Sequence, residues 1–86
     1  MTMFRICSIR DSKSESWMTP MFFHTDAQAL RSFSDVVNGD TEFGKHPEDY
    51  TLFAVGMFDD ELGEVVGFAP QSIALGANLV KGDSLR

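Results

Sequence analysis

The sequence predicts one α+β domain, in which a small antiparallel sheet of about four strands carries one amphipathic helix on a face. Three observations support this fold class. Residues 25–39 repeat apolar side chains at helical spacing, residues 50–58 form the strongest strand pattern, and residues 59–63 form a turn before a further apolar run. The element order is β-β-α-β-β, followed by a C-terminal tail. Because a helix of this length is marginal alone in water, its apolar face must lie on the sheet.

The first strand is expected within residues 2–10, where apolar side chains alternate loosely and predict partial cover on both faces. Residues 11–16 are polar and serine-rich, which is typical of a loop. Residues 17–23 end in a second, short strand. Since Pro20 lacks a backbone donor, this strand must lie at an edge of the sheet or begin after the proline.

The helix is expected to begin at a capping residue and to end before a glycine. Thr25 is placed to cap the first turn, and Gln28 completes a capping box. Asp26 puts a negative charge where the helix dipole favours one. Asn38-Gly39 predicts a left-handed exit from the helix. The apolar face comprises Ala29, Leu30, Phe33, Val36 and Val37.

A connection and a hairpin are expected after the helix. In residues 40–49, Gly44 and His46-Pro47 argue against regular structure. Strands at residues 50–58 and 64–68 are then joined by a short turn, which makes a hairpin.

Pro70 is expected to end the last strand. The 86 residues therefore predict a single domain, residues 1–86, with a core at about residues 2–69 and a tail at residues 70–86. Within the tail, residues 72–80 are apolar enough to pack, either as a short helical turn or as an extended arm. The last residues, 81–86, are expected to fray.

The formal net charge of −6 argues against a protein that coats nucleic acid through phosphate neutralisation. The charge is uneven, however. Residues 40–64 hold most of the acids and only one base, Lys45, whereas acids and bases balance in residues 1–39. A basic strip therefore remains possible in the N-terminal half. Its candidates are Arg5, Arg10, Lys13 and Arg31.

No pattern in the sequence points to catalysis, a metal or a cofactor. The single cysteine, Cys7, excludes an internal disulfide, fits a reducing cytosol and is expected to be a buried small hydrophobe. His24 and His46 have no partners at metal-ligand spacing. The acids at residues 59–64 are explained by a turn. Because no catalytic pattern is present, we do not expect an enzyme. The longest apolar run falls far short of the roughly 20 residues that span a bilayer, so we do not expect a membrane protein.

Residues 17–23 contain more large apolar side chains than one face of a strand can bury. Part of this cluster should therefore contact a second chain or stack on nucleic-acid bases. We favour burial in a homodimer interface over base stacking. The candidate residues are Trp17, Met18, Met21 and Phe22.

Four segments, in this order and spacing, resemble one known family. They are residues 8–13 at the end of the first strand, residues 25–38 of the helix, residues 46–52, and residues 56–60 with Gly63. The family is the small nonstructural protein of gokushovirus-type microviruses, which are single-stranded DNA bacteriophages. The resemblance covers about residues 4–68.

This resemblance implies a protein that is made in the infected bacterial cytoplasm and is absent from the virion. It implies a role in single-stranded genome synthesis or in packaging, with DNA binding as the activity commonly described. The basic strip and the exposed aromatics would then bind single-stranded DNA. Alternatively, the chain is an acidic adaptor that docks on the phage replication initiator, a host replication protein or the procapsid without contacting DNA.

Overall fold

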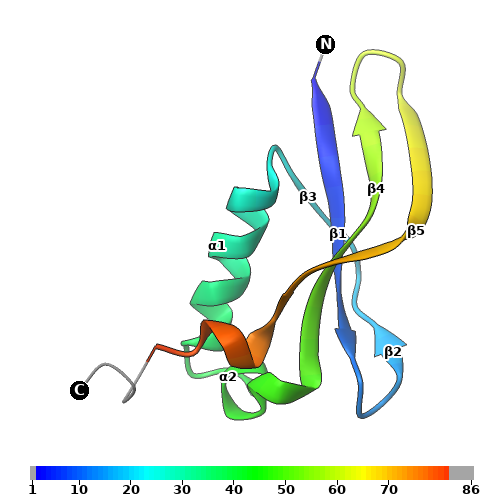
Figure 1. Cartoon of the computed structure of the whole chain (residues 1–86). Helices are drawn as coiled ribbons and strands as arrows, with labels where there is room; N and C mark the ends of the chain where they lie inside the picture. Colours follow the sequence, from blue (N-terminus) through cyan, green and yellow to red (C-terminus); the bar gives the residue numbers. More distant parts are fainter. Residues whose placement is uncertain (1, 82–86) are drawn as a thin grey trace.

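The computed structural model describes residues 2–81 as an antiparallel sheet with one long helix on one side (Figure 1). The expectation that the last residues fray falls mainly on residues 82–86, which lie outside the described residues. The strands are β1 (Met3–Asp11), β2 (Ser16–Trp17), β3 (Met21–Phe23), β4 (Tyr50–Asp59) and β5 (Glu64–Leu75). The helical elements are α1 (Asp26–Val37), α2 (Glu42–Lys45), the 3-10 turn η1 (Pro47–Asp49) and the 3-10 turn η2 (Gly76–Leu79).

The sheet order is β2-β1-β4-β5. The strand β3 also pairs with β1, at residues 5–7, whereas β2 pairs at residues 10–11. All the pairings are antiparallel. The α+β class and the antiparallel sheet with one main helix are confirmed. The predicted second strand is β3, which begins at Met21, after the proline as predicted. The short strand β2 was not predicted, and Pro20 lies in the interruption between β2 and β3. Pro20 cannot donate to the ladder, which explains the interruption.

The start of α1 follows the predicted cap. The Thr25 hydroxyl oxygen accepts a hydrogen bond from the Gln28 amide at 3.1 Å. The Gln28 side chain reaches back, and its Oε1 accepts from the His24 amide at 2.9 Å. Two amides at the helix entrance are thereby satisfied by side chains. The helix buries Ala29, Phe33 and Val37 against the sheet.

The predicted left-handed exit from α1 is wrong. Asn38 has a φ of −95°, and among the described residues the only glycine with positive φ is Gly63 in the β4–β5 turn. Side chains terminate the helix instead. The side-chain nitrogen Nδ2 of Asn38 donates to the carbonyl oxygens of Ser34 at 2.9 Å and Leu79 at 2.8 Å. The side-chain oxygen Oδ1 accepts from the Lys81 backbone amide at 2.8 Å. One side chain thus caps the helix and ties the end of the chain to it.

Residues 40–49 also differ from expectation, because they form a helical turn and a 3-10 turn. The Thr41 hydroxyl accepts from the Gly44 amide at 3.1 Å, which starts α2. Gly44 is required here for space rather than for flexibility, since a Cβ would lie 2.3 Å from the Gly39 carbonyl oxygen. The turn places Phe43 against Tyr50, with ring centroids 4.7 Å apart. This packing overrides the local preference against helix.

Pro70 does not end the last strand, because β5 continues to Leu75. The β4–β5 pairing shifts register between Ala54 and Gly56, so that residues 68–70 form an irregularity opposite Val55. Since β5 is an edge strand and the proline lies in this bulge, no ladder hydrogen bond is lost. The strand bends there, and its second half passes toward the end of α1 (Figure 1).

The core therefore extends beyond the predicted boundary at residue 69. Its centre lies between α1 and the sheet. Ile73 of β5 and Leu79 of η2 pack against that centre. The fully and nearly fully buried members are Cys7, Ile9, Ala29, Phe33, Val37, Tyr50 and Leu52. Cys7 is 0% exposed, and burial raises the pKa of its thiol.

We predict that Asn38→Ala destabilises the fold by about 1–3 kcal/mol, because it removes three hydrogen bonds that each contribute on the order of 1 kcal/mol. Urea unfolding followed by circular dichroism measures the loss. Asn78→Ala, an exposed asparagine in η2, is the matched control and should shift stability by less than about 0.5 kcal/mol. Equal losses in the two variants would contradict the capping role of Asn38.

Candidate functional site: an open aromatic face of the sheet

The strand pairings divide the sheet residues between two faces. Residues that pair across antiparallel strands share a face, and successive residues alternate. Cys7 and Ile9 pair with Ala54 and Leu52 on the face that α1 covers. Phe4 pairs with Phe58 on the opposite face. No described helix packs on that second face (Figure 1), which is here called the open face. Its large apolar members are Phe4, Ile6, Trp17, Phe22, Phe53, Phe58 and Val65.

Three phenylalanines and a valine form a shallow hollow at the hairpin end of the open face. Phe58 lies with its ring centroid 6.2 Å from that of Phe4 and 5.9 Å from that of Phe22, the latter edge-on. Val65 pairs with Phe58 and completes the wall. The hollow measures about 370 Å³. Phe22 remains 53% exposed and Val65 62% exposed, so the hollow offers ring faces and edges to solvent.

A second aromatic pair lies at the other end of the open face. The Trp17 and Phe53 centroids are 5.0 Å apart at an interplanar angle of 62°, and Trp17 is 44% exposed. Arg10 pairs in register with Trp17 on one side and Thr51 on the other, so its guanidinium belongs to this face. A flat aromatic side chain and a cation therefore lie side by side at this end.

The open face also buries its own small layer. Ile6 is 6% exposed and Ser8 is 4% exposed, although both alternate away from the helix. The Ser8 hydroxyl donates to the Met18 carbonyl oxygen at 2.7 Å, which satisfies it without a partner from the helix. The aromatics on this face thus shield part of β1 from water and still keep exposed surface of their own.

The four candidate cations do not lie on one surface. Arg5 alternates onto the helix side, where its Nε donates to the Asp26 carboxylate at 2.7 Å and its guanidinium lies 5.8 Å from the Phe68 centroid. Arg31 is exposed on α1 and lines a hollow with Asp35. Of the four, the strand register places Arg10 on the open face.

Lys13 lies in the β1–β2 turn beside an acidic hollow. That hollow is lined by Asp11, Lys13, Glu42, His46, Glu48, Asp49 and Tyr50. Burial, followed by the carboxylates of Asp11 and Glu42, raises the pKa of Tyr50. Ligand atoms of His46, Glu48 and Asp49 lie within 4.8 Å of one another. All three groups are exposed or half-buried, and exposed side chains at such distances do not by themselves make a metal site.

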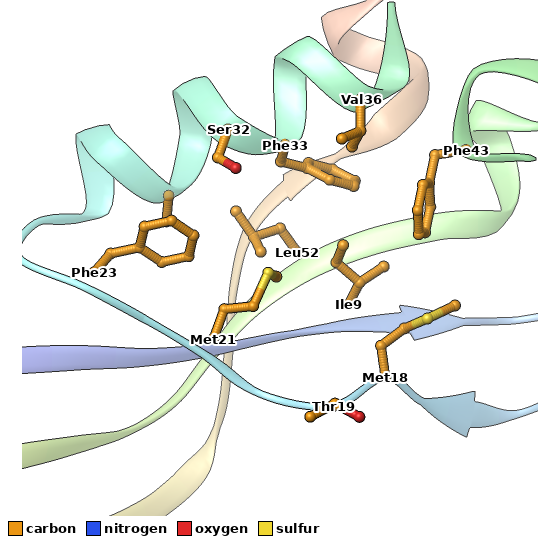
Figure 2. Close-up of a pocket in the computed structure, with 11 residues that line it drawn as sticks. Ile9, Met18, Thr19, Met21, Phe23, Ser32, Phe33, Val36, Phe43 and Leu52 are labelled. Carbon is orange, nitrogen blue, oxygen red and sulfur yellow. The ribbon is translucent and has the colours of Figure 1, made fainter. Parts of the chain in front are cut away.

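The candidate apolar residues divide between the two faces. Trp17 and Phe22 lie on the open face, whereas Met18 and Met21 line a cavity of about 290 Å³ between α1 and the β2–β3 segment. Figure 2 shows this cavity, with Phe33 and Val36 above it and Ile9 below. Met21 and Phe23 also pack against the core. These residues therefore contribute to the interior as well as to exposed surface.

The acidic hairpin is held by its own side chain. Asp59 is 8% exposed, and its Oδ1 accepts from the amides of Glu61 at 2.9 Å and Leu62 at 3.2 Å. The Gly63 amide then donates to the Asp59 carbonyl at 2.8 Å. Asp60 continues the β1–β4 ladder, because its amide donates to the Thr2 carbonyl and its carboxylate accepts from the Thr2 amide. Asp60 thus lies just past the end of β4, at the hairpin end of the sheet and two residues beyond Phe58, with its carboxylate held against the backbone just before β1.

Sequence reasoning missed Phe4, Phe53, Phe58 and Val65 as members of a site. Alternation from Leu52 and Ala54 places Phe53 away from the helix, so this residue could have been found. The same alternation would place Phe58 on the helix side, because the register shift near Val55, which changes the phase along β4, cannot be read from the sequence.

Comparison with known proteins gives one family. Residues 4–79 match the model of a protein family described as Phage ORF5 protein. No curated protein and no solved structure matches the chain. Among the helices that residues 2–81 form, none has the length and the apolar run needed to cross a membrane.

We predict that Phe53→Leu changes the fluorescence emission of Trp17, the single tryptophan of the chain, because the two rings are in edge contact. Phe58→Leu is the matched control on the same strand, and its ring contacts are with Phe4 and Phe22. It should leave the emission maximum unchanged. A larger shift with Phe58→Leu would contradict the arrangement of the open face.

Proposed function

The chain belongs to the Phage ORF5 protein family, and we propose that it acts in the synthesis or packaging of a single-stranded phage genome by binding single-stranded DNA on the open face. The observation that carries the proposal is the row of partly exposed aromatics with Arg10 at one end. The same proposal places the protein in the cytoplasm of the infected bacterium and outside the virion.

Base stacking suits this surface. Every nucleobase has a π-face, so aromatic platforms bind single strands with little sequence preference, at about 1–3 kcal/mol per stacked base. Trp17 is exposed enough to receive a base, and Phe22 and the Phe4–Phe58 pair offer further rings. The hollow is lined by apolar side chains, which cannot read the hydrogen-bonding edges of a base. We therefore expect binding that tolerates most sequences.

Phosphate contacts are a smaller part of the proposal. With Arg5 paired to Asp26 and Arg31 on the helix, Arg10 is the cation that lies beside the stacking platform. Each phosphate neutralised on a single strand contributes a slope of about −0.7 to the salt dependence of log affinity. One contact thus lowers affinity roughly threefold between about 50 and 200 mM salt, and two contacts lower it roughly sevenfold.

The acidic adaptor is the second candidate function. Asp60 lies two residues beyond Phe58, which lines the apolar hollow, and the net charge of −6 disfavours a surface dominated by phosphate contacts. The partners proposed for this function are the phage replication initiator, a host replication protein or the procapsid. Such a contact would use the hollow and the hairpin and would need no DNA.

We predict saturable binding of a labelled oligothymidylate in fluorescence anisotropy, weakening about threefold to sevenfold between about 50 and 200 mM salt. Arg10→Ala should flatten this dependence, while the control Arg31→Ala, which removes an exposed cation on α1, should not. Trp17→Ala should weaken binding by about 1–3 kcal/mol through lost stacking. Equal effects of Arg10→Ala and Arg31→Ala would rule out the open face as the binding surface.

The adaptor function predicts a different outcome in infected cells. Partners captured on the immobilised protein should survive nuclease treatment, and Val65→Lys, which places a cation in the wall of the hollow, should release them. Val80→Lys, at another exposed valine away from the open face, is the control and should retain them. Loss of every partner after nuclease treatment would count against the adaptor.

A further inference from the structure

Opposite charges lie at the two ends of the open face. Arg10 lies at the Trp17 end, and Asp60 lies beyond Phe58 at the hairpin end. Thr2, the partner of Asp60, is eight residues from Arg10 along β1, which corresponds to roughly 26 Å in a strand. Between the two charges lie the exposed side chains of Trp17, Phe22 and Val65. The exposed His24 stacks on Phe4, with ring centroids 4.6 Å apart.

This distribution is complementary to itself. A two-fold axis that lies in the interface, perpendicular to the strands, brings the Arg10 end of one copy onto the Asp60 end of the other, twice. The same rotation stacks one apolar surface on the other. We propose that the open face binds a second copy of this chain in this antiparallel arrangement. A second copy supplies the opposite charge at each end and an apolar surface between the two ends. The charges also set its direction, since a parallel arrangement would set Arg10 against Arg10 and Asp60 against Asp60.

The size of the face is suitable. A standard interface buries about 800 Å² on each partner, of which somewhat more than half is apolar. Trp17 at 44% exposed, Phe22 at 53% and Val65 at 62%, together with the half-buried phenylalanines, supply apolar surface on the order of 400 Å². Polar rim residues at the two ends supply the rest.

A regulatory consequence follows, and it rests on the proposed function. If single-stranded DNA stacks on Trp17 and contacts Arg10, the dimer and the DNA complex use the same atoms. Self-association then holds the protein in a form that does not bind DNA, and free single strands draw it into monomeric complexes. The affinity for DNA should accordingly fall as protein concentration rises above the dissociation constant of the dimer.

Sedimentation velocity in the absence of DNA tests the interface directly. Wild-type protein should be a dimer at micromolar concentration. Arg10→Glu and Asp60→Arg should each weaken the dimer at least about tenfold, because each sets two like-charge pairs across the two-fold axis. An equimolar mixture of the two variants should dimerise again, since both pairs in the mixed dimer carry opposite charges. Asp60→Asn, which keeps an oxygen for the Thr2 amide, separates the loss of charge from the loss of that hydrogen bond.

The outcomes separate the two proposals. A monomeric wild type, or a mixture that dimerises no better than either variant alone, would overturn the interface. Dimerisation that persists in both single variants would assign it to another surface, such as the β5 edge. Adding oligothymidylate to the wild-type dimer should produce monomeric complexes by mass. DNA bound to an intact dimer would overturn the competition, whereas an intact dimer with no DNA binding would leave the interface standing and remove the proposed function.

Discussion

One helix covers only one face of a sheet, and most features of this protein follow from that constraint. The 12 residues of α1 extend about 18 Å, whereas the nine residues of β1 extend about 30 Å. The helix therefore shields the part of one face around Cys7, Ile9 and Leu52, and it leaves the opposite face without a second layer. Ile6 and Ser8 are buried there by aromatic side chains of the sheet itself. The exposed rings that result are the structural basis of the candidate site.

The bend in the sheet compensates for the short helix. The β1–β4 register shifts between Ile6 and Cys7, and the β4–β5 register shifts on both sides of Phe53 and Ala54. Gly56 permits the close approach, because a Cβ there would lie 2.6 Å from the Val66 carbonyl oxygen. The redirected half of β5 then delivers Ile73 and η2 to the end of α1, where Asn38 binds the backbone of Leu79. A single asparagine consequently links the helix exit to the closure of the core.

Local rules predicted the local features of this fold. The cap at Thr25, the start of β3 after Pro20 and the turn ending at Gly63 each depend on a few neighbouring residues, and all three are present. The errors arose where distant residues decide. Pro70 stays within a strand because it lies in a bulge, where the backbone N–H that proline lacks is not needed for the ladder. Residues 42–45 become helical because Phe43 packs on Tyr50. The split of Trp17 and Phe22 from Met21 and Phe23 likewise requires the register, which no local pattern reveals.

Net charge is a poor guide to how this surface interacts. At physiological salt the Debye length is about 8 Å, so the acids of the hairpin, roughly 26 Å along the strand from Arg10, have little influence at that end of the face. Lys13, by contrast, lies in the same hollow as Asp11 and Glu42, where their carboxylates offset its charge. Arg10 lies beside one end of the open face, and Asp60 lies past the other end. With so few charges, binding energy on this face must come mainly from contact with the aromatic rings. That requirement is met by unpaired bases and by a second apolar face, and it is not met by a duplex, whose bases are already stacked.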